Sequence, residues 1–332
     1  MGKLSNTELK TLLSCIKKDS RVIIPPMIGY DSGVHAVDGK YIVIATDPCI
    51  GVPEEWFGYL LINYAASDVA LSGAKPEFCT VNLLGPLSTK TEVFHKVMTQ
   101  TCKAADELDV AIVRGHTGIY QGIQSLVGVA TVYGSVQLEK LITPNNAKPE
   151  DVILCTKPLG QETVTNFSLI NSKLAEELFG AEQREKSSRQ IRLQSCVREA
   201  QQLAKTEVVH AMHDATEGGF AAALNELSEA SGFGFRVDWE RIPISREVLA
   251  LQNYFNLSYD QVLAMSSTGT VMAAVDPYSL DKARASLRQI GVSAYILGEF
   301  TESKERVIVK MGKEMSFPSD ANDPYTLILS GK

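Results

Sequence analysis

Three aspartates at the ends of predicted elements could bind a divalent cation. Asp31 lies in a turn flanked by glycines, Asp47 follows a predicted strand, and Asp68 lies late in a predicted helix. Hard cations such as Mg²⁺ take oxygen ligands and keep several waters, and phosphate often completes the shell. Each aspartate taken singly is also typical of a helix cap or a turn. As a set they suggest a magnesium site, with capping and turn roles as the alternative.

The helix that carries Asp68 has clear start and stop signals. Pro53 suits the first helical position, an apolar stripe runs through residues 56–65, and Gly73 and Pro76 end the pattern. Asp68 therefore lies beside the stripe and near the negative end of the helix dipole, where a carboxylate is disfavoured unless a cation compensates. That cation could be a metal ion or the side chain of an ion-pair partner, and the segment alone does not choose between them.

A second candidate is the run Arg-Gly-His-Thr-Gly at 114–118, which follows a predicted short buried strand at 109–113. We expect this run to form a turn at the end of that strand, which is where open α/β folds place ligands. His116 could then donate a hydrogen bond to phosphate, act as a general base or bind a ligand. Alternatively its ring only organises the turn.

A third candidate is the run Asp-Ala-Thr-Glu-Gly-Gly at 214–219, which lies between a predicted strand and a predicted helix. Its glycines permit close approach of the backbone, and the first turn of the helix offers free N–H groups to an anion. The alternative is a plain strand-to-helix turn with Asp214 or Thr216 as the N-cap.

Composition narrows the class of protein. The chain has 332 residues, a hydrophobic fraction of 45% and a net charge of -7, which gives no electrostatic case for binding nucleic acid or an anionic membrane. No long apolar run is present, and the first residues are too polar for a signal peptide, so we expect a cytoplasmic protein. The six cysteines form no C-x-x-C pair, which is typical of reduced thiols. No P-loop or Rossmann glycine motif occurs.

Strands and helices alternate in two modules separated by the polar run at 143–150. We therefore predict an α/β (α+β) protein with domains at 1–147 and 148–332. The expected strands are 40–46, 77–84, 109–113, 124–137, 151–156, 208–212, 234–238, 270–275, 293–298 and 306–310. The main expected helices are 53–73, 89–107 (started by a capping box at Thr89–Glu92), 163–180, 189–205, 220–231, 246–255 and 279–290.

The ordered motifs resemble those of the aminoimidazole ribonucleotide (AIR) synthetase superfamily, which includes thiamine-monophosphate kinase, selenophosphate synthetase and the hydrogenase-maturation carbamoyl dehydratase. The resemblance runs over roughly residues 25 to 312. It is carried by G-x-D-S-G-V (29–34), T-D-P (46–48), N-x-x-x-S-D-V-A-x-x-G-A-x-P (63–76), G-H-T (115–117) and D-A-T-E-G-G (214–219).

That resemblance implies a two-domain protomer whose N-terminal domains pair in a homodimer and close a β-barrel across the interface. It also implies an ATP- and Mg²⁺-dependent phosphoryl transfer. Asp31, Asp47 and Asp68 would hold Mg²⁺, and His116 and Asp214 would be catalytic. The residues expected to bind the cofactor are Asn63, Gly115, Thr117, Thr216, Gly218 and Gly219.

Departures from the family pattern leave the acceptor open. The second half is most similar to the dehydratase, yet Lys332 stands at the end of the chain where that enzyme carries a reactive cysteine. Cys15 and Lys18 have the C-x-x-K spacing, but we expect Cys15 to pack on a helix rather than lie in the Gly-rich loop of a selenophosphate synthetase. The prediction is phosphoryl transfer to a small amide, carbonyl or phosphate acceptor. The alternative is a nucleotide-binding maturation factor with a protein partner and little turnover.

Overall fold

The computed structural model describes residues 6–319 and 322–331, so both the start of the polar N-terminus and Lys332 lie outside the described residues. The chain divides into two compact units, each of which is described by itself. The N-terminal unit comprises Lys17–Pro26 and Asp31–Leu141. The C-terminal unit comprises the described residues of Met1–Ile16, Met27–Tyr30 and Ile142–Lys332.

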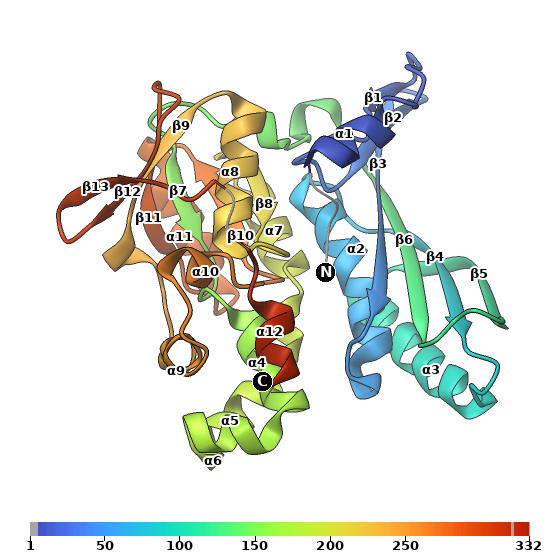
Figure 1. The fold of residues 1–332 in the computed structure, drawn as a ribbon. Helices are drawn as coiled ribbons and strands as arrows, with labels where there is room; N and C mark the ends of the chain where they lie inside the picture. Colours follow the sequence, from blue (N-terminus) through green and yellow to red (C-terminus); the bar gives the residue numbers. More distant parts are fainter. Residues whose placement is uncertain (1–5, 320–321, 332) are drawn as a thin grey trace. The chain divides into compact units, whose positions relative to one another are not determined.

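The N-terminal unit is a six-stranded sheet in the order β1-β2-β3-β6-β4-β5, in which β4 and β5 are parallel and all other neighbours are antiparallel. Two long helices, α2 and α3, contact the strands and one another (Figure 1). The elements are β1 (Val22–Ile24), β2 (Gly33–Val37), β3 (Lys40–Ile50), η1 (Glu54–Trp56), α2 (Phe57–Leu71), β4 (Phe78–Gly85), α3 (Thr91–Leu108), β5 (Ala111–Ile119), β6 (Val127–Val136) and η2 (Leu138–Lys140).

One face of this sheet is covered and the other is bare. Successive residues of β6 alternate between buried and half-buried positions, and β4 alternates in the same way. Because successive side chains of a strand point to opposite faces, this pattern marks one face that packs on the helices and one that does not. Large apolar side chains lie on the bare face, among them Ile44, Ile50, Phe78 and Tyr133. The rings of Phe78 and Tyr133 stack at a centroid distance of 5.5 Å.

Strand β3 runs further than the sequence predicts. β3 continues through Asp47 and Pro48 to Ile50, so the prediction that Asp47-Pro48 ends the strand is wrong. Pairing with β2 covers β3 only from Lys40 to Ile44, so among the described residues that side of β3 has no partner strand beyond Ile44. A proline, which has no N–H to donate, is tolerated at such an edge.

The predicted Arg-Gly-His-Thr-Gly turn is likewise wrong, because these residues form the middle of β5. They pair in parallel with β4, with Asn82 opposite His116. β5 is the edge strand of the sheet and is largely exposed, so the prediction of a buried strand at 109–113 is also wrong. Polar residues are common on edge strands, where they discourage pairing with other chains.

The C-terminal unit is built on a seven-stranded sheet in the order β13-β12-β9-β11-β7-β10-β8, in which only β9 and β12 are parallel (Figure 1). Its elements are α1 (Asn6–Leu13), η3 (Pro144–Asn146), β7 (Val152–Cys155), α4 (Gln161–Ile170), α5 (Ser172–Phe179), α6 (Ala181–Ser188), η4 (Arg189–Gln194), α7 (Val197–Ala204), β8 (Val209–Asp214), α8 (Gly219–Ser231), β9 (Gly234–Asp238), η5 (Trp239–Arg241), α9 (Arg246–Tyr254), α10 (Tyr259–Leu263), β10 (Val271–Val275), η6 (Pro277–Ser279), α11 (Leu280–Gln289), β11 (Tyr295–Thr301), β12 (Arg306–Lys310), β13 (Lys313–Ser316) and α12 (Tyr325–Ser330).

The centre of this second sheet is buried on both faces. All five residues of β10 are buried, and its neighbours β7 and β8 are nearly so. One apolar cluster gathers side chains from these strands and from α4, α8 and α9. Within the part of the chain that the structure describes, no helix is long and apolar enough to cross a membrane.

Candidate active site

Helix α2 carries two of the predicted site residues. Asp68 lies in its last turn and is half-buried. Asn63 is buried, and its Nδ2 donates a hydrogen bond to the Tyr59 carbonyl oxygen at 2.9 Å. Gly58 allows α2 to approach α3 closely, because a Cβ there would lie 2.4 Å from the Val97 carbonyl oxygen. The packing of α2 therefore fixes the position of the turn that holds Asp68.

The other two predicted metal ligands lie on elements that adjoin α2. Ser32, next to Asp31 in sequence, makes a buried hydroxyl–hydroxyl hydrogen bond of 2.6 Å with Ser72, the C-cap of α2. Asp47 lies on β3, which packs on α2. It lies on the same face of the strand as the buried Ala45 and Cys49. The side chain of Asp47 thus points to the covered, helix-facing side of the sheet.

Asp31, Asp47 and Asp68 converge on α2 without forming one tight cage. Among the described residues, their carboxylate oxygens do not form a group in which all lie within 4.8 Å of one another. Because magnesium is usually bound through one or two carboxylates together with phosphate and water, the set suits a metal–phosphate site better than an all-protein cage.

His116 lies on the bare face of the N-terminal sheet, opposite Asn82 on β4. Its Nε2 is 2.5 Å from the Tyr120 hydroxyl, so the ring is held by a residue four positions along the chain. Gly115 and Thr117 flank it on β5, and a Cβ at Gly115 would lie 2.8 Å from the Val81 carbonyl oxygen. A catalytic role for His116 stays a prediction.

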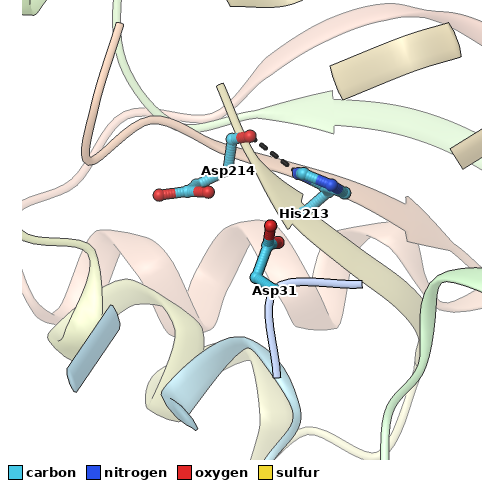
Figure 2. A group of neighbouring side chains, drawn as sticks. All are labelled: Asp31, His213 and Asp214. Carbon is cyan, nitrogen blue, oxygen red and sulfur yellow. Dashed lines mark hydrogen bonds between the residues drawn. The ribbon is translucent and has the colours of Figure 1, made fainter. Parts of the chain in front are cut away.

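In the C-terminal unit, Asp214 ends β8 and is buried (Figure 2). Its carbonyl oxygen accepts a hydrogen bond of 2.7 Å from Nδ1 of His213, drawn as the dashed line. The other ring nitrogen of His213, Nε2, lies 2.8 Å from Oε2 of Glu226 on α8. These contacts orient the buried imidazole at the end of β8.

The turn after Asp214 places the start of α8. Its N-cap is Gly218 (φ 79°), so neither Asp214 nor Thr216 is the N-cap and that alternative is wrong. Thr216 instead accepts the Gly219 N–H through its carbonyl oxygen at 2.9 Å. Gly219 also has a positive φ, and a Cβ there would lie 2.3 Å from the Met265 carbonyl oxygen. Glycine is therefore required where the chain enters the helix.

Polar residues far away in sequence surround this turn, and no spacing pattern could have shown them. Asp323 accepts hydrogen bonds from the Gly218 N–H at 3.0 Å and from the Ser266 hydroxyl at 2.5 Å. The buried Glu162 accepts from the N–H and hydroxyl of Thr268. The pKa of Glu162 is raised to about 7, chiefly because burial disfavours its charged form.

Cys15 does not pack on a helix as predicted. Helix α1 ends at Leu13, and Cys15 lies beyond it and is exposed. All six cysteines are free thiols, as the sequence predicts.

Comparison with known proteins identifies the family of this chain. Residues 29–136 match the N-terminal domain of AIR synthase related proteins, and residues 148–310 match the C-terminal domain. Carbamoyl dehydratase HypE of Cupriavidus necator is 30% identical over 283 residues, which cover 82% of this chain and 77% of that protein. The chain therefore belongs to the AIR synthase-related family, as its motifs predict. Selenide, water dikinase of Myxococcus xanthus is 26% identical over 93% of each chain.

Solved structures share the fold. The HypE–HypF complex contains a chain that matches with a TM-score of 0.72 and 22% identity over 86% of this chain and 92% of that chain. HypE in complex with ATP matches with a TM-score of 0.72 and 18% identity over 94% and 91% of the two chains. The predicted two-domain AIR-synthetase-like α/β fold is confirmed.

Proposed function

We propose that this protein is an ATP- and Mg²⁺-dependent enzyme that transfers a phosphoryl group to a small amide, carbonyl or phosphate acceptor. The observation that carries the proposal is the convergence of three carboxylate-bearing elements on α2, through the Ser32–Ser72 contact, the packing of β3, and Asp68 itself. Support also comes from the ATP complex of the structural neighbour HypE and from the relative selenide, water dikinase.

The donor set fits magnesium, because all three candidate ligands are hard oxygen donors. In this proposal Asp31, Asp47 and Asp68 hold the ion, which supplies neutralisation of phosphate charge. Asn63 is held on α2 by its hydrogen bond to the Tyr59 carbonyl oxygen, and it would support the phosphate site. Phosphoryl transfer depends mainly on positioning and charge neutralisation, so these side chains suffice without a covalent nucleophile.

The turn at the start of α8 is the proposed site of phosphate or acceptor binding in the C-terminal unit. Thr216, Gly218 and Gly219 lie at the positive end of a 13-residue helix, whose dipole favours a bound anion. Asp214 is a candidate to bind or deprotonate the acceptor. The sequence and the family do not name that acceptor.

We further propose that the protein is a homodimer in which the bare face of the N-terminal sheet is covered by a second copy. Contiguous apolar side chains on a sheet face are typical of an interface. The edge strand β5, which carries His116, would lie at the rim of that contact.

A second candidate function is that of a maturation factor that binds nucleotide and a protein partner with little turnover. The HypE–HypF complex among the structural neighbours favours it. Steady-state release of phosphate from ATP with a panel of small carboxamides and carbonyl compounds separates the two. Tight ATP binding with no turnover on any acceptor would support the second.

The metal–phosphate role is tested by Asp68→Asn, with Asp106→Asn, an exposed aspartate of α3 in the same unit, as the matched control. Loss of one carboxylate ligand should weaken Mg²⁺-dependent ATP binding by about 10-fold or more, equivalent to at least about 1.4 kcal/mol. The measurement is isothermal titration with ATP in the presence and absence of Mg²⁺. Equal ATP affinity in the wild type and both variants would remove Asp68 from the site.

A further inference from the structure

A histidine outside the proposed site forms a chain of hydrogen bonds in the C-terminal unit. His210 lies on β8, the edge strand of the second sheet, and 26% of its side chain is exposed. Its Nδ1 lies 2.8 Å and 2.9 Å from the two carboxylate oxygens of the buried Asp151. Its Nε2 lies 3.1 Å from Nζ of Lys148, which is exposed. The three side chains therefore lead from the interior of this unit to its surface.

The chemistry of the three groups fixes the direction of each hydrogen bond. The ammonium group of lysine can only donate, so Lys148 donates and Nε2 of His210 accepts. The imidazole then carries its proton on Nδ1, which donates to the Asp151 carboxylate. A histidine that a carboxylate orients through Nδ1, and whose Nε2 can take up a proton, has the arrangement of a general base. The group next to this base is the Lys148 amine.

A tight turn holds Lys148 beside this histidine. The Asp151 N–H donates to the Lys148 carbonyl oxygen at 3.1 Å, and the Lys148 N–H donates to Asp151 Oδ2 at 2.8 Å. Pro149 restricts the backbone at the second position of the turn, and Glu150 at the third position has a φ of 71°. A positive φ is unfavourable for glutamate and persists only where the surrounding structure enforces it. The turn therefore fixes the backbone of Lys148 relative to the carboxylate that orients His210.

We propose that Lys148 is an acylation site, at which its amine takes an acyl group from a small activated donor with His210 as the general base. The donor is an acyl phosphate or a thioester. The free amine attacks the acyl carbon and forms a C–N bond, and the bond from that carbon to oxygen or sulfur breaks as phosphate or thiolate leaves. The attacking nitrogen gains positive charge, and its surplus proton passes to Nε2 of His210.

Asp151 has a supporting part in this step, because its carboxylate stabilises the imidazolium that forms. The product is an uncharged amide at a position where the protein carried an ammonium group. The inference goes beyond the proposed function and does not depend on it. Loss of ATP turnover, or its absence, would leave the reactivity of Lys148 unchanged.

The test compares the acetylation rates of two lysines in the full-length protein. The matched control is Lys282, an exposed lysine of α11 whose ammonium group has no hydrogen bond or ion pair with any described residue. The probes are acetyl phosphate and, in a separate arm, acetyl-coenzyme A, both without an acetyltransferase. Mass spectrometry of peptides cut at glutamate follows each lysine over time.

With at least one donor, Lys148 should be acetylated about 10-fold faster than Lys282. This factor is below the roughly 100-fold or more that a general base contributes in an active site, because the donor is not held in place. The arm in which the preference appears identifies the class of donor. Equal rates at the two lysines with both donors would overturn the proposal.

His210→Gln separates the base from the hydrogen bond. A glutamine amide oxygen can accept a hydrogen bond from Lys148 but cannot take up its proton. In this variant Lys148 should react at the rate of Lys282. His95→Gln, which replaces an exposed histidine of α3, should keep the wild-type preference. A preference for Lys148 that persists in His210→Gln would overturn the role of His210.

Two measurements on the wild type serve if His210→Gln does not fold. In D₂O, acetylation of Lys148 should slow by a larger factor than that of Lys282, because only at Lys148 does a proton move to a side chain during the attack. In guanidinium chloride the two lysines should react at equal rates, because unfolding removes His210 from Lys148. An equal solvent isotope effect at both lysines, or a preference that survives unfolding, would overturn the proposal.

Discussion

The two sheets of this protein solve the problem of burying apolar surface in different ways. In the N-terminal sheet, α2 and α3 cover one face, and Ile44, Ile50 and Phe78 remain 38%, 55% and 42% exposed on the other. In the C-terminal sheet, every residue of the central strand β10 is buried. The first sheet has an apolar surface to offer to a second chain, whereas the second is complete within one chain.

This difference separates two kinds of site. The carboxylates of the N-terminal unit lie on α2 and on the elements that adjoin it, on the covered side of the sheet. The turn at α8 is closed by residues of its own unit, including Asp323.

The largest expected effect comes from burying a charge in the C-terminal sheet. Ala273 lies in the middle of β10 and is 1% exposed, so Ala273→Glu places a carboxylate among apolar side chains. We expect the free energy of unfolding to fall by about 3 kcal/mol or more. Urea unfolding followed by circular dichroism measures this, and a stability equal to that of the wild type would show that the sheet is not closed on both faces.

The same substitution on the bare face should have a different result. Ile44→Glu should leave the fold intact, because that side chain faces away from the helices. It should weaken dimerisation by more than about 100-fold, since a symmetric interface loses the side chain twice. Sedimentation velocity measures the effect, with Tyr278→Glu at a highly exposed position of the C-terminal unit as the control. A monomeric wild type would refute the shared-sheet model.

Much of the fold could be predicted from the sequence, because hydrophobic periodicity and glycine or proline punctuation are local signals. Strands at 234–238 and 306–310 are confirmed at both ends, and the helix predicted to run to 107 is observed as α3. The predicted Thr89–Glu92 capping box is wrong, because the N-cap of α3 is Lys90 and no side chain caps the helix. β5 was missed as a strand beyond residue 113. Its Gly-His-Thr run has the composition of a turn, and only the pairing with β4 makes it a strand.

The residues of the candidate site also differ in how well local sequence signals predict them. Motifs predict Asp68 and the glycines of the α8 turn, because the sequence signals for these positions lie in neighbouring residues. The bonds of Asp323 to Gly218 and Ser266 span 105 and 57 residues. No local pattern encodes such a contact, so only the folded chain brings these residues together.

A smaller expected effect concerns the buried carboxyl of Glu162 in the C-terminal unit. The pKa of Glu162 is about 7 when folded against an ordinary value of 4.5, so folding favours its protonated form. Stability contributed by this group is complete below about pH 4.5 and is lost as pH rises through 7, by up to about 3 kcal/mol. Glu162→Gln should flatten that dependence. Urea midpoints at pH 5 and pH 8 measure it, and an unchanged slope would show that Glu162 titrates normally.

The smallest effect tests whether the bare face of the N-terminal sheet gives access to its interior. Cys79 lies on the helix-facing side of β4, and burial raises its pKa to about 11; burial raises the pKa of Cys155 in the C-terminal sheet to about 12. Both thiols should therefore be inert to a disulfide reagent at pH 8, because the thiolate is the reactive form.

Only the exposed Cys15 and Cys102 should react in the native protein, with all six thiols reacting after denaturation. Cys102→Ser should lower the native count by one. The labelling rate of Cys79 should match that of Cys155. An uncovered sheet face exposes only the side chains that point towards it, and the alternate residues of the same strand stay buried under the helices. Fast labelling of Cys79 alone would mean that α2 and α3 open readily, and the two sheets would then differ in local stability as well as in coverage.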